Sequence, residues 1–317
     1  MRLVFSCSTD GLIIDKTTRP YNAGDPMDLP QFYERLWDFC QKYNYCFHPM
    51  VDAYTVKEWR ENLQWWIEEC EKRNTNVLDK VMMLEVRNPY SWNDETITDY
   101  LKFLKSLVEY TIKLCDCEKD PVQFLRHTFE ILTYKQSPIK RSTYFPWGTR
   151  TSYRASCSVT QSFCIRLGDL SICPCHRLAY PKLIYGKYLT ENNNIIGIET
   201  NNISGVITHY ITGCGSYLKC DSCAFSELCI KGCHGAQFEY SKEYLYPIPS
   251  VCELEQAKIL FIILNILKLV EISGDIKDPR VLREINRVKD IYQSIQKKEP
   301  EVCKKWIPIV QTLLLEI

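Results

Sequence analysis

The sequence predicts an α/β protein: the C-terminal half of a partial (βα) barrel, then an irregular cysteine-rich domain, then C-terminal helices. Three observations support this fold class. Short apolar runs alternate with helical patterns up to about residue 135, which is typical of parallel βα units. Ten of the 17 cysteines lie between Cys157 and Cys252, where apolar periodicity is weak. The residues that follow form a long, mostly apolar helical pattern.

The elements of the first 135 residues follow from local patterns. Three apolar runs predict strands, over residues 2–8, 45–51 and 81–86. Four helices are expected, over about residues 30–42, 55–70, 94–114 and 121–134. Asp28 is a cap for the first helix, and Thr55 with Glu58 is a capping-box pattern for the second. Asp10 and Gly11 predict a turn, with a loop after it.

Three βα units are too few to close a barrel, which needs about eight strands. The first predicted strand begins at residue 2, and a buried parallel strand needs a neighbour on each side. The sequence therefore favours the second half of a barrel, whose first half is missing or is supplied by another chain. A complete three-stranded sheet is the alternative.

Three further segments complete the predicted organisation. Residues 136–154 are polar, contain Pro138 and Pro146, and predict a linker. Residues 155–255 are irregular and include short strands such as the one in "NNIIGIET". Residues 256–317 hold the C-terminal helices. A long apolar helix begins near Glu253, and a shorter helix ends the chain.

Charge and hydropathy exclude several classes of function. The 39 basic and 39 acidic residues balance, which gives no electrostatic case for nucleic acid or an anionic membrane surface. The apolar run "ILFIILNIL" lies between Lys258 and Lys268 and is too short to span a bilayer. The N-terminus has no signal-peptide pattern. We therefore expect a cytoplasmic protein whose cysteines hold metal and do not form disulfides.

The cysteines follow one spaced order. Cys157 is followed by Gly168 and Cys173, then by the run C-x2-C-x5-C-x3-C, and then by Cys252; the run contains Cys220, Cys223, Cys229 and Cys233. Thiolates select zinc, Cu(I) or iron–sulfur clusters. Seven cysteines suit two four-iron clusters, with Cys164, Cys175 and Cys214 in reserve. A zinc module with four thiolate ligands is the alternative.

This order resembles the SPASM domain of radical S-adenosylmethionine enzymes, whose signature is C-x9-15-G-x4-C, a gap, C-x2-C-x5-C-x3-C, a gap and C. Upstream, "FSCSTDG", "FHPMV" and "MMLEVRN" more weakly resemble the later barrel strands of peptide-modifying members. The resemblance implies two auxiliary [4Fe–4S] clusters and a peptide or protein substrate. It also implies a cluster that cleaves S-adenosylmethionine, so that the resulting radical can abstract a substrate hydrogen atom.

The resemblance also implies which cysteines bind each cluster. The outer cluster takes Cys220, Cys223, Cys229 and Cys252. The inner cluster takes Cys157, Cys173 and Cys233, with Cys164 as the candidate fourth ligand. Family members often have Pro-Cys at the second ligand position, so Cys175 competes with Cys173 there.

Two residues are candidate catalytic groups. In anaerobic sulfatase-maturating enzymes an Asp follows the second ligand, whereas Pro174 or His176 follows it here. A His at this position is similar to enzymes that modify small ribosomal peptides. His176 is the candidate proton donor or acceptor. Asp10 follows a predicted strand, where barrel active sites lie. Glu85 and Arg87 share one face of the third strand, facing either a cavity or each other.

Radical S-adenosylmethionine enzymes bind their catalytic cluster through C-x3-C-x2-C, and this sequence has no such triplet. The resemblance therefore implies that the chain is not active alone. S-adenosylmethionine and a third cluster would come with the missing N-terminal half or a partner chain, together with an electron donor. Two alternatives remain: a non-catalytic iron–sulfur module that passes electrons or presents a substrate, and a zinc-stabilised binding protein.

Overall fold

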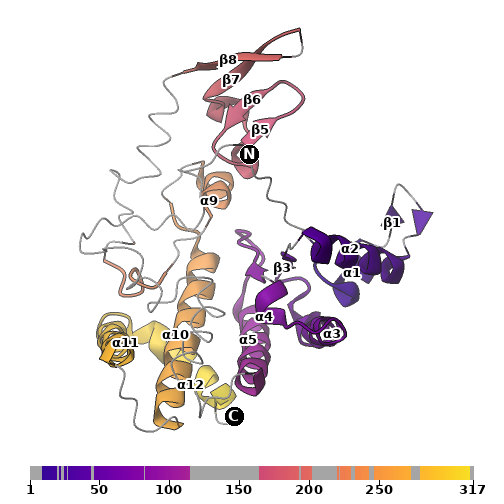
Figure 1. Ribbon diagram of the computed structural model, residues 1–317. Coiled ribbons are helices and arrows are strands. Elements are labelled where there is room, and N and C mark those ends of the chain that lie inside the picture. Colours follow the sequence, from indigo (N-terminus) through magenta and orange to yellow (C-terminus); the bar gives the residue numbers. More distant parts are fainter. Residues whose placement is uncertain are drawn as a thin grey trace.

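The computed structural model of the protein (Figure 1) describes most of both halves of the chain. The described residues are 9–19, 21–22, 25–26, 28–43, 46–81, 83–114, 164–192, 194–201, 220, 222–229, 233–242, 246–272 and 279–314. The predicted strand over residues 2–8, the helix over 121–134, the linker over 136–154 and the ligand Cys157 lie outside them.

The first described part alternates helices with very short strands. In chain order the elements are α1 (Leu12–Thr18), β1 (Tyr21–Asn22), β2 (Asp25–Pro26), α2 (Leu29–Tyr43), β3 (Met50–Val51), the 3₁₀ turn η1 (Val56–Glu58), α3 (Trp59–Glu71), α4 (Val77–Lys80), β4 (Leu84–Glu85) and α5 (Asp94–Leu114). Strands β1 and β2 form a small antiparallel pair.

The predicted parallel βα arrangement is confirmed for the second and third apolar runs, which pair with each other. Met50 pairs with Leu84 in the parallel β3–β4 ladder, and a bridge from Phe47 to Val81 extends the pairing backwards. The amide of Val86 donates to the carbonyl of Val51 at 2.8 Å and extends it forwards. The half-barrel itself stays a prediction, because this sheet has two strands among the described residues.

Helices α2 and α5 agree with the sequence. The Asp28 carboxylate accepts a hydrogen bond from the amide of Gln31 at 3.1 Å, which confirms the predicted cap of α2. Helix α5 has the predicted bounds. At its start the Asn93 side chain accepts a hydrogen bond from the amide of Thr96 at 3.0 Å. In return, the Thr96 hydroxyl accepts one from the amide of Asn93 at 2.9 Å.

Two local predictions near the N-terminus are wrong. A helix, α1, follows Gly11 where a loop was expected, because buried contacts of Asp15 hold it in place. The capping box at Thr55 does not form either. Thr55 makes no side-chain cap, its hydroxyl bonds the carbonyl of Asp52 at 3.4 Å, and a 3₁₀ turn precedes α3.

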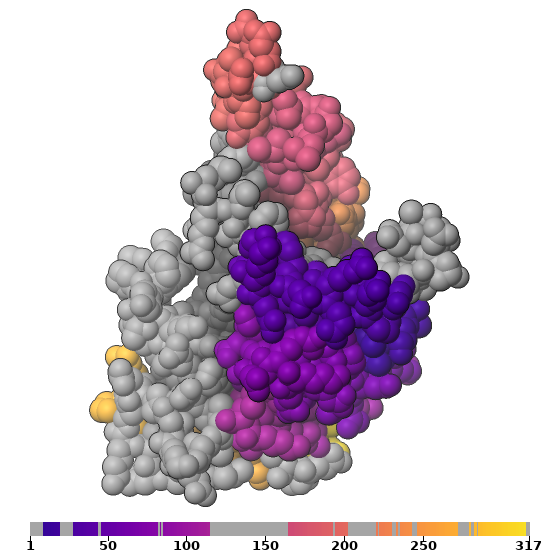
Figure 2. Space-filling model, turned by 45° about the vertical axis from the view of Figure 1, so that its right-hand side comes forward, coloured from indigo at the N-terminus to yellow at the C-terminus, as the bar shows by residue number. Residues whose placement is uncertain are grey.

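The cysteine-rich region contains a four-stranded antiparallel sheet in the order β5-β6-β7-β8. Its elements are β5 (Cys164–Arg166), β6 (Ser171–Cys173), the 3₁₀ turns η3 (His176–Leu178) and η4 (Pro181–Leu183), β7 (Gly186–Glu191), β8 (Asn194–Thr200) and helix α9 (His234–Ser241). Strand β8 confirms the strand expected in "NNIIGIET". Figure 2 shows the sheet projecting at the top of the view, beyond the indigo and magenta surface of the first part.

Three helices end the described chain: α10 (Pro249–Ile272), α11 (Pro279–Lys298) and α12 (Pro300–Leu314). The long apolar helix is confirmed, although it begins before Glu253, and the predicted boundary between residues 255 and 256 falls inside it. The expectation of one shorter helix after it is wrong. Two helices follow, and the second begins at Pro300, which suits the first turn of a helix.

One large apolar core joins the two ends of the chain. It includes Trp37, Trp59 and Trp66 from the first part and Trp306 from α12, each at most 1% exposed. Helix α10 packs beside α5, α11 and α12, as Figure 1 shows. Among the described residues, no helix has both the length and the apolar character needed to cross a membrane.

Gly11 lies at a tight junction and should not tolerate a side chain. Its φ of 110° is unfavourable for other residues, and an added Cβ would lie 2.7 Å from Trp66 Nε1 and closer still to Asn62. We expect Gly11→Ala to lower the free energy of unfolding by about 2 kcal/mol or more, measured by urea denaturation. Gly168→Ala is the matched control, because nothing lies within 4 Å of its added Cβ. Equal unfolding midpoints for the two variants would contradict this account.

Candidate functional site

Three of the predicted outer-cluster ligands lie around one small cavity. Cys220 and Cys229 come from the loop before α9, and Cys252 comes from the start of α10. The cavity has a volume of about 30 Å³. The other residues that line it are Gln237, Pro247, Ile248, Val251 and Glu255. We call it the thiol cavity.

The loop that carries these thiols is built from tight turns on an aromatic anchor. The amide of Cys223 donates to the carbonyl of Cys220 at 3.3 Å, and the amide of Cys229 donates to that of Phe225 at 2.9 Å. Phe225 is buried in the main core. Among the described residues, Cys223 is the one predicted outer-cluster ligand that does not line the thiol cavity; it packs against the edge of the core.

Two of the predicted inner-cluster ligands face each other across a strand pair. Cys164 on β5 and Cys173 on β6 are directly opposite in the antiparallel register, so their side chains share one face of the sheet. The Cys173 thiol also contacts the carbonyls of Cys164 and Cys175, each at 3.5 Å. Burial raises the pKa of Cys173 to about 11. Cys175 is half-buried in a separate small apolar cluster.

Cys233 lies immediately before α9, beside the side chain of Arg177. The pKa of Arg177 is raised, chiefly by its hydrogen bonds to Glu239, with a further contribution from Cys233. Arg177 Nε lies 2.8 Å from the Glu239 carboxylate. An added Cβ at Gly235 would lie 2.7 Å from the Arg177 side chain, so glycine is required for this approach.

The structure thus brings together part of the predicted ligand set. Cys220, Cys229 and Cys252 share a cavity, and Cys164 and Cys173 share a sheet face. Soft thiols in these two places suit the donor chemistry of zinc or iron–sulfur groups. Within the described ranges, however, no three cysteine, histidine or acidic side chains are close enough to hold a metal ion together.

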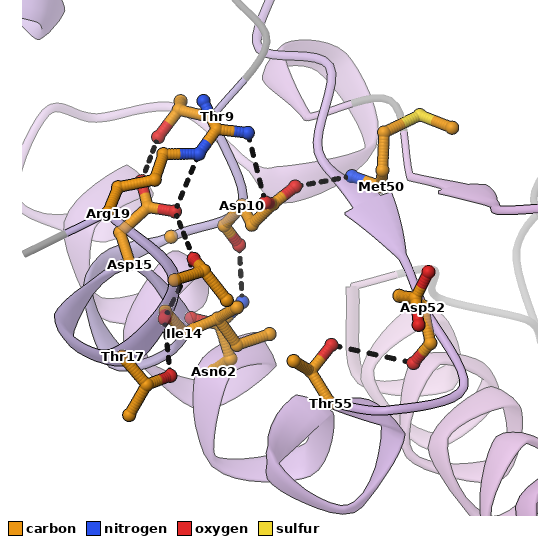
Figure 3. A network of polar contacts seen from close by, with 12 residues as sticks. Thr9, Asp10, Ile14, Asp15, Thr17, Arg19, Met50, Asp52, Thr55 and Asn62 are labelled. Carbon is orange, nitrogen blue, oxygen red and sulfur yellow. Dashed lines mark hydrogen bonds and ion pairs between the residues drawn. The ribbon is translucent and has the colours of Figure 1, made fainter.

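Asp10 lies in a network of polar contacts at the junction of α1, β3 and α3 (Figure 3). One carboxylate oxygen accepts from the amide of Met50 at 2.9 Å, and the other pairs with Arg19 at 3.1 Å. The Asp10 carbonyl accepts from Asn62 at 2.6 Å. Burial raises the pKa of Asp10 despite the opposing effects of Met50 and Arg19. Asp10 therefore fixes α1 to the start of β3, and its catalytic role stays a prediction.

The candidate His176 begins η3 and is exposed to solvent. It follows Cys175 directly and precedes Arg177. Its side chain is therefore available at the edge of the region that carries the predicted inner-cluster ligands. Its proposed role in proton transfer stays a prediction.

A buried group of four charged side chains lies next to the thiol cavity. Glu85 and Arg87 come from the end of β4, and Glu255 and Lys258 come from α10. We call this group the ion network. Arg87 pairs with Glu85 at 2.8 Å, and Lys258 bonds Glu85 and, at 2.9 Å, Glu255. The strand pattern predicts that Glu85 and Arg87 share a face. The strand pattern does not predict their partners on α10, Glu255 and Lys258. The i, i+3 spacing of these two charged residues in an apolar helix is a signal that indicates them.

The two carboxylates of the ion network differ in acidity. Burial alone would raise the pKa of Glu85, but Lys258 and Arg87 hold it well below its ordinary value. Burial raises the pKa of Glu255, although Lys258 and Arg87 oppose this effect. The hydroxyl of Tyr100 on α5 lies 3.4 Å from Glu85. The firmly ionised group of the network is therefore Glu85, between two cations.

Comparison with solved structures finds a similar fold in anSMEcpe, an anaerobic sulfatase-maturating enzyme of the radical S-adenosylmethionine/SPASM class. Native anSMEcpe with bound AdoMet gives a TM-score of 0.53 at 12% identity, covering 86% of this chain and 68% of that chain. A histidine-tagged form of anSMEcpe with bound AdoMet gives 0.50 at 14% identity, covering 90% and 68%. Native anSMEcpe with bound AdoMet and Kp18Cys peptide gives 0.50 at 14%, covering 86% and 69%.

The other two comparisons give no relative. No protein-family model matches the chain, and no curated protein matches it significantly. At 12–14% identity, the structural similarity shows the fold alone.

The positive charge of Lys258 should contribute strongly to the stability of the folded chain. We expect Lys258→Met to lower the free energy of unfolding by about 3–5 kcal/mol, because it leaves buried carboxylates without their main counter-ion. Urea denaturation followed by tryptophan fluorescence measures the change. Lys305→Met is the matched control: Lys305 pairs with Asp94 and Glu253 at the surface, so its loss should cost less than about 1 kcal/mol. An equal cost for both variants would contradict the role of the ion network.

The ion network should also give stability a defined pH dependence. The folded-state pKa of Glu85 lies below its ordinary value of 4.5, so its contribution is complete above about pH 4.5 and is lost as the pH falls further. We expect Glu85→Gln to be less stable than the natural chain near pH 7, with a difference that shrinks below about pH 4.5. Denaturation series between pH 3 and pH 7 measure it. A constant difference across this range would rule out an ionised Glu85.

Proposed function

We propose that this chain is the iron–sulfur-binding C-terminal portion of a radical S-adenosylmethionine/SPASM enzyme that modifies a peptide or protein. The observation that carries the proposal is the meeting of Cys220, Cys229 and Cys252 at one cavity. Cys252 lies 23 residues after Cys229 in the sequence, and the resemblance to the SPASM domain implies that the three residues bind one cluster. The similarity to the fold of anSMEcpe supports the same class.

In this proposal the cysteines hold two auxiliary [4Fe–4S] clusters. Cys220, Cys223, Cys229 and Cys252 bind the outer cluster. Cys157, Cys173 and Cys233 bind the inner cluster, with Cys164 opposite Cys173 as the fourth ligand; Cys175 is the alternative to Cys173. When bound, such clusters can accept or donate one electron. Burial and hydrogen bonds to sulfur set their reduction potential.

The chain's own residues have defined tasks in this proposal. Phe225 anchors the cysteine-bearing loop on the core. Helix α10 places Cys252 at the cavity that Cys220 and Cys229 of this loop also line. Arg177 lies beside Cys233 and places a positive charge next to this predicted ligand. His176, exposed next to this region, accepts or donates a proton during substrate modification, and Asp10 is the second candidate for this role.

A peptide substrate is proposed on two grounds. One of the similar structures, native anSMEcpe, contains AdoMet and the Kp18Cys peptide. The His176 that follows the second ligand position resembles enzymes that modify small ribosomal peptides. The chain lacks C-x3-C-x2-C, so activity also requires a polypeptide that carries this triplet, with its own cluster and S-adenosylmethionine, and an electron donor.

A second candidate function is a non-catalytic iron–sulfur module that passes electrons or presents a peptide to a separate enzyme. The absence of the triplet from this sequence favours it. Supplying a polypeptide with C-x3-C-x2-C separates the two functions, because only the first gains S-adenosylmethionine cleavage. A zinc-stabilised binding protein is the third candidate.

Iron and sulfide analysis tests the proposal. After anaerobic reconstitution, we expect about eight irons and about eight acid-labile sulfides per chain, with absorbance near about 400 nm. Changing Cys220 and Cys223 to Ala should remove about half of the iron, because the outer cluster loses two of its four ligands. Cys46→Ala is the matched control, because Cys46 is exposed and belongs to neither predicted ligand set.

The same measurement can refute the proposal. Zinc bound without sulfide would end the radical-enzyme interpretation and leave the binding protein. An unchanged iron content after the double substitution would refute the assignment of Cys220 and Cys223.

A further inference from the structure

Four consecutive residues after β4 each contact the cysteine-rich region or α10. We call residues 87–90 the linking loop. Their partners are Glu255 for Arg87, Arg177 for Asn88, Ser250 for Pro89 and Tyr240 for Tyr90. These partners lie on three different elements, namely α10, η3 and α9. Each of these elements carries or adjoins a predicted cluster ligand.

The contacts of the linking loop are specific in geometry. The Asn88 side-chain carbonyl accepts a hydrogen bond from Arg177 at 3.1 Å. The Pro89 carbonyl accepts one from the Ser250 hydroxyl at 2.7 Å. Both partners lie two residues from a predicted ligand, Arg177 after Cys175 and Ser250 before Cys252. The loop therefore reaches both groups of cysteines through short hydrogen bonds.

The linking loop also lies at a functionally favourable edge. It leaves the carboxyl end of β4 in the parallel β3–β4 pair, and ligands of α/β sheets bind at the carboxyl ends of parallel strands. A loop at this edge lies beside the place where a substrate is expected. It also contacts α10, η3 and α9, the elements that carry or adjoin the predicted ligands. Its conformation can therefore set the spacing between the two.

Glu255 connects the linking loop to the thiol cavity. One of its oxygens accepts from Lys258 at 2.9 Å and lies 3.4 Å from Arg87. The side chain is 2% exposed and lines the cavity together with Cys220, Cys229 and Cys252. Its second oxygen, Oε2, has no hydrogen-bond partner among the described residues. A buried, unpaired carboxylate oxygen at a cavity indicates a place where a further donor is expected.

We propose that the linking loop is a positioning element that fixes the thiol-bearing segments against the carboxyl edge of β3–β4, with Glu255 joining it to the thiol cavity. Glu255 and Asn88 are positioning residues for the two predicted cluster sites. The inference rests on the proposed function only where it concerns bound metal, because the contacts belong to the chain itself.

Hydrogen–deuterium exchange of the full chain tests the inference. In Glu255→Gln we expect exchange to accelerate by about tenfold in peptides over residues 84–91 and over 246–252 together. The substitution removes the negative charge that pairs with Arg87 and Lys258, so the linking loop and the start of α10 should both open more often. Glu253→Gln is the matched control: Glu253 lies on the same helix but pairs with Lys305, so exchange over 84–91 should not change. Unchanged exchange over 84–91 in Glu255→Gln would overturn the inference.

A second pair of variants guards against a general loss of folding. Asn88→Ala removes the acceptor for Arg177, whereas Asn88→Asp retains an oxygen there. We expect Asn88→Ala to accelerate exchange over residues 174–180 by about tenfold and Asn88→Asp to restore it. Equal exchange in both variants would show that the Asn88 contact positions nothing.

Reconstituted protein separates this inference from the proposed function. We expect iron loading to slow exchange over residues 84–91 in the natural chain but not in Glu255→Gln. If the protein binds no iron but Glu255→Gln still accelerates exchange over both segments, the proposed function is refuted and the positioning role stands. If the protein binds its full complement of iron but Glu255→Gln leaves exchange over residues 84–91 unchanged, the positioning role alone is refuted.

Discussion

The buried ion network is the interaction on which the arrangement of the chain depends. It joins Glu85 at the end of β4 to Lys258 on α10, two residues 173 positions apart. Charges in a core are stable only when each has its partner, so the network tolerates one relative placement of strand and helix. That placement turns Cys252, one turn before the network, towards Cys220 and Cys229.

The described part of the cysteine-rich region, by contrast, has little apolar core of its own. Its small buried clusters contain Leu178, Leu183 and Phe238 in one place, and Ala236, Ile248 and Val251 in another. Strand β8 is almost entirely exposed. The region is therefore held by a few anchors, Phe225 in the main core and Arg177 between Asn88 and Glu239. Under the proposed function, metal binding would supply further folding free energy there.

The fold and the chemistry come from different evidence. The fold is similar to that of anSMEcpe at 12–14% identity, and a shared fold does not carry an activity with it. The metal-binding chemistry comes from this chain's own thiols: three of them share a cavity, and two face each other on β5 and β6.

The sequence by itself determined the long helices, through local periodicity, and the parallel βα arrangement, through the alternation of strand and helix patterns. The spacing of the cysteines is read from the sequence directly. Tertiary structure decided the rest. Helix α1 is short and is held by contacts of Asp15 with Thr9 and Tyr33, which no local pattern reveals. The partners of Glu85 and Arg87 arrive from a distant helix. The meeting of Cys252 with Cys220 and Cys229 depends on that same long-range contact, because spacing fixes order along the chain but not position in space.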